Sequence, residues 1–417
     1  MPGSRGVAAA GAAAVLALTA GCGMLGLGED AAESDEDRLV NMINDSNRLE
    51  AELAAAEYRL IEKCLEDAGF TVHDPWALQA YEPEEQESLS EYPPHEGFII
   101  EAEEAAEYGF GQWANGPDGM EDPATEDYWA AEEEEWQEEE GDSYEEPDTA
   151  EWDALDPADQ YAWYVAYQGE EYAEWSYGSA QEYADMMAGE GDYAEDAIAE
   201  EEAVADEGEI DLEEEMDPEP KPGGCQLEMI QQLHGEPELV EESYENEDGS
   251  TETWEYWSYG VENPLYASET MWEDIELDYA DKMADEQDAF LDCISGKGYE
   301  GWEFDQYNAL PVWEFFAQLY YQNASEEEKD MMLGDSDAVV PEIPEAAGSS
   351  YEEWKAYEIQ MAVDFAACGD ETGYADASEQ AYEEAHVDAY TAVEQDVYAW
   401  QEKIKEALAT AQELLDA

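Results

Sequence analysis

Apolar residues recur at spacings of three, four and seven along residues 39–64, which predicts a long helix with one buried face. This stripe consists of Leu39, Met42, Leu49, Leu53, Ala56, Leu60 and Cys64. Tyr279, Met283 and Phe290 form a similar stripe that leads to Cys293. Both stripes end in the form C-x4-G-aromatic, at Gly69-Phe70 and Gly298-Tyr299, where the glycine can take the left-handed conformation that ends a helix. The pattern therefore predicts two long helices with related ends.

Helix start and stop signals predict further helices. Asp156-Pro157 is typical of a helix start, with Gly169 as the corresponding end. Ser325 and Glu328 have the spacing of a capping box, and Gly334 follows them.

The longest apolar face lies near the C-terminus and predicts a helix that packs on another helix. It comprises Tyr382, Ala385, Ala389, Val393, Val397, Trp400, Ile404, Leu408, Ala411 and Leu415. Strand signals gather in residues 238–258, where Asn246-Glu247-Asp248-Gly249 can turn a hairpin. The predicted fold class is mostly α: two helical modules, acidic linkers and a long C-terminal helix.

These patterns divide the chain into consecutive regions. They are a signal peptide (1–21), a lipid-anchored flexible spacer (22–37), an N-terminal helical region (38–130), an acidic linker (131–150), a helical hairpin (151–189), a second acidic linker (190–222), a mainly helical region with a β-hairpin (223–345) and the C-terminal helices (346–417). The two linkers are interpreted as disordered or loosely helical; the alternative is the charged outer face of ordinary helices.

The N-terminal residues predict export and anchoring. Arg5 precedes an apolar run, residues 7–20, that is too short to span a bilayer permanently. Leu18-Thr19-Ala20-Gly21-Cys22 resembles a bacterial lipobox, in which a peptidase cuts before the cysteine and its sulfur carries a diacylglyceryl group. Thr19 departs from the commoner leucine. Acyl chains on Cys22 would anchor the chain to the outer face of the plasma membrane without spanning it.

Four cysteines follow the anchor: Cys64, Cys225, Cys293 and Cys368. An even number in an oxidising compartment predicts two disulfides, and four cysteines allow three pairings. The related helix ends favour two pseudo-repeated halves, with Cys64 joined to Cys225 and Cys293 to Cys368. A zinc site is the competing interpretation, which the absence of any C-x2-C pair disfavours.

No motif indicates catalysis, a cofactor or a specific metal site, so the chain is predicted not to be an enzyme. The histidines (His73, His95, His234 and His386) are interpreted as structural or exposed, because none has a histidine partner at helical spacing. Residues 244–255 align imperfectly with a calcium loop, because Tyr244 stands at the first ligand position. Glycan binding or hydrolysis needs only aromatic residues or paired carboxylates, which are too common here to be informative.

The lipobox is followed by several short blocks of sequence: KCLEDAGF, DALDPADQYAWYVAYQG, GGCQ, DCISGKGY and EIQMAVDFAAC, in this order. Together they resemble a group of uncharacterised exported lipoproteins of actinobacteria. The resemblance implies an all-helical envelope lipoprotein with paired cysteines. It carries no activity and no catalytic residues.

The net charge of −103, from 115 acidic and 12 basic residues, sets the class of partner. It excludes nucleic acids and leaves divalent cations or a basic protein. One hypothesis is adaptation to brine, since the Debye length falls from about 8 Å at 0.15 M salt to about 3 Å at 1 M. The rival is that the acidic surface binds cations or basic ligands. We expect an anchored envelope protein with a structural or interaction role.

Overall fold

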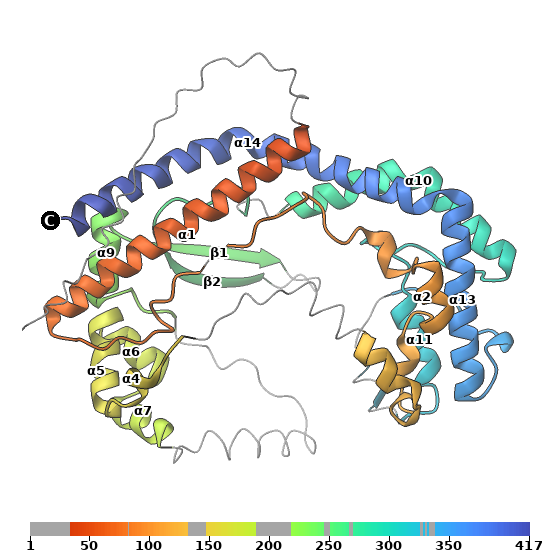
Figure 1. Cartoon of the computed structure of the whole chain (residues 1–417), viewed down its shortest axis with the longest axis horizontal. Helices are drawn as coiled ribbons and strands as arrows, with labels where there is room; N and C mark the ends of the chain where they lie inside the picture. The colour runs from red at the N-terminus through yellow and green to blue at the C-terminus, as the bar shows by residue number, and fades with distance from the viewer. Residues whose placement is uncertain are drawn as a thin grey trace, which may run out of the picture. The chain divides into compact units, whose positions relative to one another are not determined.

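The computed structural model describes residues 34–417 except 82, 132–146, 189–217, 246–250, 267–269, 326–327, 330–331 and 333–337. The described part of Asp35–Ala417 is one contact unit and is mostly helical (Figure 1). The predicted signal peptide and Cys22 lie outside the described residues. Two separate groups of helices each bury an apolar core, which agrees with the two predicted helical modules.

The first core lies between α1 (Asp35–Ala68), α9 (Gly224–Leu233) and four short helices. The short helices are α4 (Ala150–Asp153), α5 (Pro157–Gln168), α6 (Glu170–Tyr177) and α7 (Ala180–Met187). Leu65, Trp163 and Ile230 are fully buried there. The apolar stripe predicted on α1 faces this core and the smaller clusters along the same helix.

The second core lies between α10 (Met271–Lys297), α11 (Val312–Tyr320) and α13 (Tyr351–Thr372), and residues 94–121 close it. That segment contains η1 (Pro94–Gly97), α2 (Ala102–Tyr108), η2 (Gln112–Ala114) and η3 (Gly119–Glu121), and η4 (Glu345–Ala347) precedes α13. Aromatic rings dominate this core: Phe290 lies edge-on to Phe98 and to Phe365, with ring centroids 5.5 and 5.7 Å apart.

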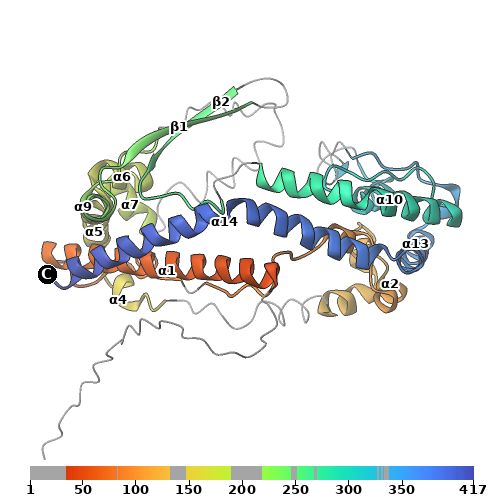
Figure 2. The ribbon, with the colours of Figure 1, turned by 90° about the horizontal axis from the view of Figure 1, so that it is seen from above.

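The C-terminal helix α14 (Tyr374–Leu415) belongs to both cores. Its first half runs antiparallel to α10, because Tyr374 contacts Phe290 while His386 contacts Trp272. Its second half runs parallel to α1: Gln401 donates to the carbonyl of Met42, and Ala411 is buried in the first core. Figures 1 and 2 show α14 alongside both helices. The predicted long terminal helix is therefore confirmed, and it starts eight residues before Tyr382.

Strands β1 (Glu238–Glu245) and β2 (Thr251–Ser258) form an antiparallel two-stranded sheet, which confirms the predicted strands. The predicted turn at 246–249 lies outside the described residues.

Two glycines explain the close approach of α9 to α5. Gly223 donates its N–H to the carbonyl of Gln168 at 2.7 Å, and a Cβ on Gly223 would lie 2.9 Å from the Cα of Gly169. Gly224 has φ +53°, and a Cβ there would meet the carbonyl oxygen of Ala166 at 2.2 Å. Any other residue would push α9 away from α5.

Several predicted boundaries differ from the structure. In place of the predicted hairpin at 151–189, the structure has the short helices α4 to α7 within residues 150–187, because Gly169 and Gly178 take positive φ and Ser179 starts a new helix with a capping box. The predicted N-terminal region 38–130 does not form one unit. Helix α1 packs in the first core, whereas residues 98–114 pack in the second. Asp35–Asp37 are helical rather than spacer, and residues 218–222 of the predicted linker are ordered against the hairpin. The Ser325–Glu328 capping box is present, whereas Gly334 lies outside the described residues.

Candidate functional site

The two helix ends that share the C-x4-G-aromatic form each carry a disulfide to another helix. Cys64 on α1 bonds to Cys225 on α9, and Cys293 on α10 bonds to Cys368 on α13. The paired Cα atoms are 5.7 and 5.8 Å apart, which is usual for a disulfide. These are the pairs that the related helix ends favoured. Sulfur atoms joined in this way cannot act as thiolate ligands of zinc.

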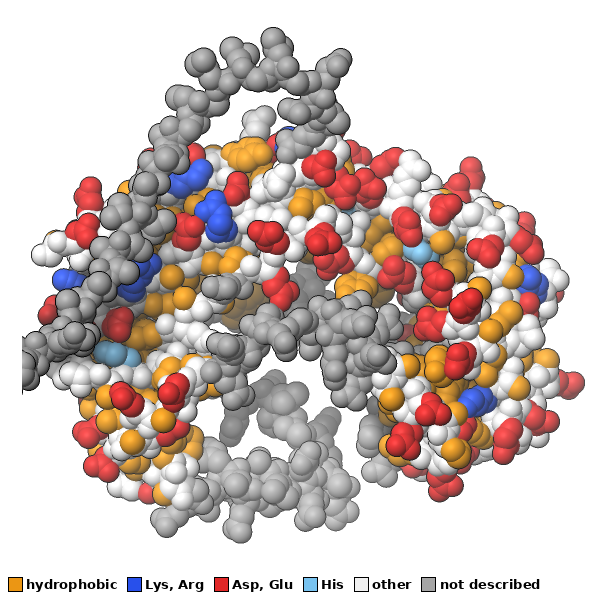
Figure 3. Space-filling model, viewed as in Figure 1, with side chains coloured by type: hydrophobic (Ala, Val, Ile, Leu, Met, Phe, Trp, Pro, Cys, Tyr) orange, Lys and Arg blue, Asp and Glu red, His pale blue; other side chains and the backbone are white. Residues whose placement is uncertain are grey.

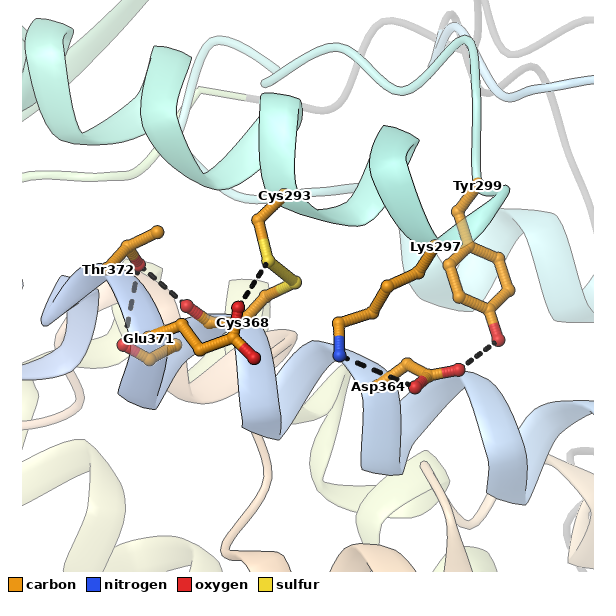
Figure 4. Close-up of a disulfide and its surroundings, with 8 residues drawn as sticks. Cys293, Lys297, Tyr299, Asp364, Cys368, Glu371 and Thr372 are labelled. Carbon is orange, nitrogen blue, oxygen red and sulfur yellow. Dashed lines mark hydrogen bonds and ion pairs between the residues drawn. A yellow bond between two sulfur atoms is a disulfide. The ribbon is translucent and has the colours of Figure 1, made fainter.

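A carboxylate lies beside each disulfide at the same place in the repeat. Glu228 follows Cys225 by three residues, and its Oε2 lies 3.5 Å from Sγ of Cys64. Glu371 follows Cys368 by three residues, and its Oε2 lies 3.8 Å from Sγ of Cys293 (Figure 4). Both glutamates are visible in the sequence as a shared C-x2-E pattern, CQLE and CGDE, which could have indicated a carboxylate near each disulfide. The negative charge would repel an incoming thiolate, the species that attacks disulfides.

A pocket of about 670 Å³ opens beside the C-terminal half of α1. Its lining comes from α1, from residues 71–80 and from residues 148–152. Arg59, Glu62, His73 and Trp152 are among the lining side chains. No pattern in the sequence points to this pocket, because its walls come from segments far apart in the chain.

Glu62, Glu66 and His73 form the candidate cation cluster at this pocket. Each offers one ligand atom, and these atoms lie within 4.8 Å of one another. The two glutamates are one helical turn apart, on either side of the disulfide-bonded Cys64. Gly69, with φ +104°, then turns the chain so that His73 returns toward α1. Carboxylate and imidazole groups are suitable ligands for divalent metals.

A hydrogen bond from Trp163 weakens this cluster as a metal site. The buried indole donates Nε1–H to Nδ1 of His73 at 3.2 Å, so a neutral His73 carries its proton on Nε2. If a cation bound Nε2 of His73, the imidazole proton would have to sit on Nδ1, where it would face the N–H of Trp163. If the cation bound Nδ1 instead, it would take the place of the Trp163 N–H. In both cases a buried N–H loses its acceptor, which costs about 1–3 kcal/mol.

The other histidines have structural partners. His95 and His386 are buried, and burial lowers the pKa of each. Nδ1 of His95 is 2.9 Å from Oγ of Ser378, which is also 2.8 Å from the hydroxyl of Tyr279. Ser378 is fully buried, so a substrate cannot reach its hydroxyl. His234 contacts Glu57 at 2.7 Å.

Glu358 of α13 is a fully buried carboxyl group in the second core. It accepts the N–H of Gln112 at 2.8 Å and the hydroxyl of Tyr320 at 2.6 Å. Burial raises the pKa of Glu358 to about 8, and these donors limit the rise. The carboxyl group thus fixes η2 and α11 to α13. The sequence does not distinguish Glu358 from the other acidic residues, of which there are 115 in all.

Ion pairs engage most of the basic residues in the described part of the chain. The residues paired with carboxylates are Arg38, Arg48, Lys221, Lys282, Lys297, Lys355 and Lys405. Acidic side chains are spread over the face in Figure 3, with few basic ones between them. Some carboxyl groups approach each other: burial and then the neighbouring Glu383 raise the pKa of Glu36, across the contact between α1 and α14.

Comparisons with known proteins do not identify a family: no family model, curated protein or solved structure matches the chain. Within the described ranges, no helix combines the length and the apolar character needed to cross a membrane.

Proposed function

We propose that this chain is a lipid-anchored envelope protein with a structural or interaction role, whose acidic surface is adapted to concentrated salt. The observation that carries the proposal is the charge balance. Most of the basic residues in the described part of the chain are already paired with a carboxylate, so few are left for the other carboxylates, and solvent cations must supply most of their screening. The two disulfides favour an oxidising compartment outside the cytoplasm. The resemblance to exported actinobacterial lipoproteins agrees with this proposal.

Molar salt is expected to stabilise the chain strongly. Thermal melts by circular dichroism compare low salt, 1 M NaCl, and low salt with a few millimolar CaCl₂, with the chain in mild detergent. The midpoint should rise by several degrees in 1 M NaCl, because the Debye length falls to about 3 Å and the repulsion between carboxylates is screened. Repeating the salt step at pH 4, where many carboxyl groups are protonated, should shrink the gain. An equal gain at both pH values would count against charge screening.

Divalent-cation binding is the second candidate function, and the Glu62–Glu66–His73 cluster is the observation that favours it. If Glu62 and Glu66 bind calcium through their carboxylate oxygens, the ligand atoms that calcium prefers, millimolar CaCl₂ should raise the midpoint at low salt. The variant with Glu62→Gln and Glu66→Gln should then lose the calcium response but keep the sodium response. As a control of equal charge, Glu406→Gln with Glu413→Gln changes two exposed glutamates on α14. Equal calcium responses in both variants would show diffuse binding instead.

Cys22 is expected to hold the chain on the membrane. With Cys22→Ser, no thioether can form, so the protein should move from the membrane fraction to the medium or to the soluble exported fraction. Immunoblots of these fractions, with mass spectrometry of the N-terminal peptide, measure the change. A chain that stays in the membrane fraction with serine at position 22 would contradict lipid anchoring.

A further inference from the structure

The β1–β2 hairpin stands apart from both helical cores. Its eight residue pairs run from Glu238–Ser258 to Glu245–Thr251, and its strands pair only with each other among the described residues. No helix contributes more than isolated contacts to either strand. A two-stranded hairpin is at best marginally stable alone. The hairpin therefore has the architecture of a sheet that a further strand would complete.

Both outer edges of the hairpin present backbone groups that no other segment among the described residues pairs with. In an antiparallel pair, the N–H and C=O groups of alternate residues point away from the partner strand. No other described backbone segment bonds to 238–245 or 251–258. Such an edge is a template for an added strand.

The side chains of the hairpin are acidic and aromatic. Residues 237–260 contain no Lys or Arg. Glu241 stands directly opposite Glu255, a pairing of like charges that weakens a hairpin unless a cation lies nearby. Trp254 and Leu239 are 44% and 48% exposed. A partner with basic groups and an apolar surface would match this combination.

An ordered segment of the same chain already shows how a basic residue meets the hairpin. Residues 218–222 lie against Trp257, whose Nε1–H donates to the carbonyl of Glu219 at 3.2 Å. The Nζ atom of Lys221 lies 5.5 Å from the centre of the Trp257 ring and 3.3 Å from Glu236. Three interactions therefore hold this segment at the hairpin: the hydrogen bond from Trp257 to a backbone carbonyl, the Lys221 cation over the Trp257 ring, and the ion pair of Lys221 with Glu236. This contact occupies Trp257.

We propose that the hairpin docks a basic, extended polypeptide segment, which adds to the outer edge of β2 as a third strand. Main-chain hydrogen bonds would hold the added strand against β2. Its Lys or Arg side chains, at alternate positions, would lie on the face of the sheet that carries Glu241 and Glu255. The apolar side chains between them would lie on the opposite face, which carries Trp254. A second copy of this hairpin does not fit, because two acidic edges repel each other. This inference specifies the interaction role proposed above and rests on it.

The test uses three synthetic eight-residue peptides with the purified full chain in detergent. One alternates Lys and Val, one alternates Glu and Val, and the third is the Lys–Val peptide with alternate backbone nitrogens methylated. Fluorescence anisotropy at 0.15 M and 1 M NaCl measures binding. We expect the Lys–Val peptide to bind at least tenfold more tightly than the methylated one at both salt concentrations, and the Glu–Val peptide not to bind. Hydrogen exchange at residues 251–258 should slow only with the unmethylated basic peptide.

Two charge variants locate the interaction. Glu241→Gln with Glu255→Gln should weaken binding severalfold without unfolding the hairpin, because it removes a repulsive pair. Glu406→Gln with Glu413→Gln removes the same charge from α14 and should leave binding unchanged.

Equal binding of the methylated and unmethylated peptides would overturn the proposal, because it would reduce the effect to attraction between a polyanion and a polycation. Failure of the basic peptide to bind at either salt concentration would also overturn it. Neither result would affect the salt or Cys22 experiments, so the two proposals fail separately.

Discussion

Replacing Glu358 by alanine is expected to lower the free energy of unfolding by about 3–5 kcal/mol, since each buried donor left unpaired costs about 1–3 kcal/mol. The N–H of Gln112 and the hydroxyl of Tyr320 would both lose their acceptor inside the second core. The substitution would also leave a cavity among aromatic side chains. Urea unfolding followed by circular dichroism measures the change. A loss under 1 kcal/mol would mean that water replaces the carboxyl group.

The variant Glu358→Gln is the matched control, because it keeps the shape of the side chain and one acceptor oxygen. The same variant tests the pKa of Glu358, which burial raises from 4.5 to about 8. Between these pH values the folded chain keeps a proton that the unfolded chain releases, so this group makes stability fall as pH rises. Glu358→Gln cannot titrate and should show a flatter decline between pH 4.5 and 8. Identical pH profiles of the two proteins would contradict the raised pKa.

Removing the disulfide of the first core is expected to cost about 2–5 kcal/mol, the usual loss for a native disulfide. The variant is Cys64→Ser with Cys225→Ser, and the same urea titration measures it. The second disulfide, removed by Cys293→Ser with Cys368→Ser, is the comparison. The bridged residues are 161 apart in the first and 75 in the second. Chain entropy alone would make the first loss larger by about 0.7 kcal/mol.

The opposite order would mean that local packing outweighs chain entropy. Glu228→Gln and Glu371→Gln address a separate property, the rate of reduction by a small thiol. Each should speed reduction of the adjacent disulfide, because the carboxylate near the sulfur is lost.

Long apolar periodicity was the part of the sequence that predicted structure well. The stripes before Cys64 and Cys293 and the face from Tyr382 to Leu415 all lie on single helices. Over several turns, a continuous buried face leaves few alternatives to a helix. The strand signals in residues 238–258 also predicted the two strands that the structure has there.

Features that depend on tertiary contacts could not be predicted. The apolar residues between 151 and 189 suit one hairpin or several short helices, and only the positive φ of Gly169 and Gly178 decides between them. The pocket joins α1 to residues near 75 and 150, and no sequence periodicity links these segments. Glu62 and Glu66 resemble every other pair of glutamates one turn apart until His73 is brought beside them.

The dual membership of α14 sets a limit on when the chain can fold during synthesis. Its residue Ala411 completes the first core, although the rest of that core comes from residues made long before. A nascent chain that has produced α1, α5 and α9 therefore still leaves part of their apolar surface exposed. Because α14 is made after the helices that it covers, the first core can be completed only once residue 411 has been synthesised. A chain that must pass a translocation channel unfolded would gain from this delay.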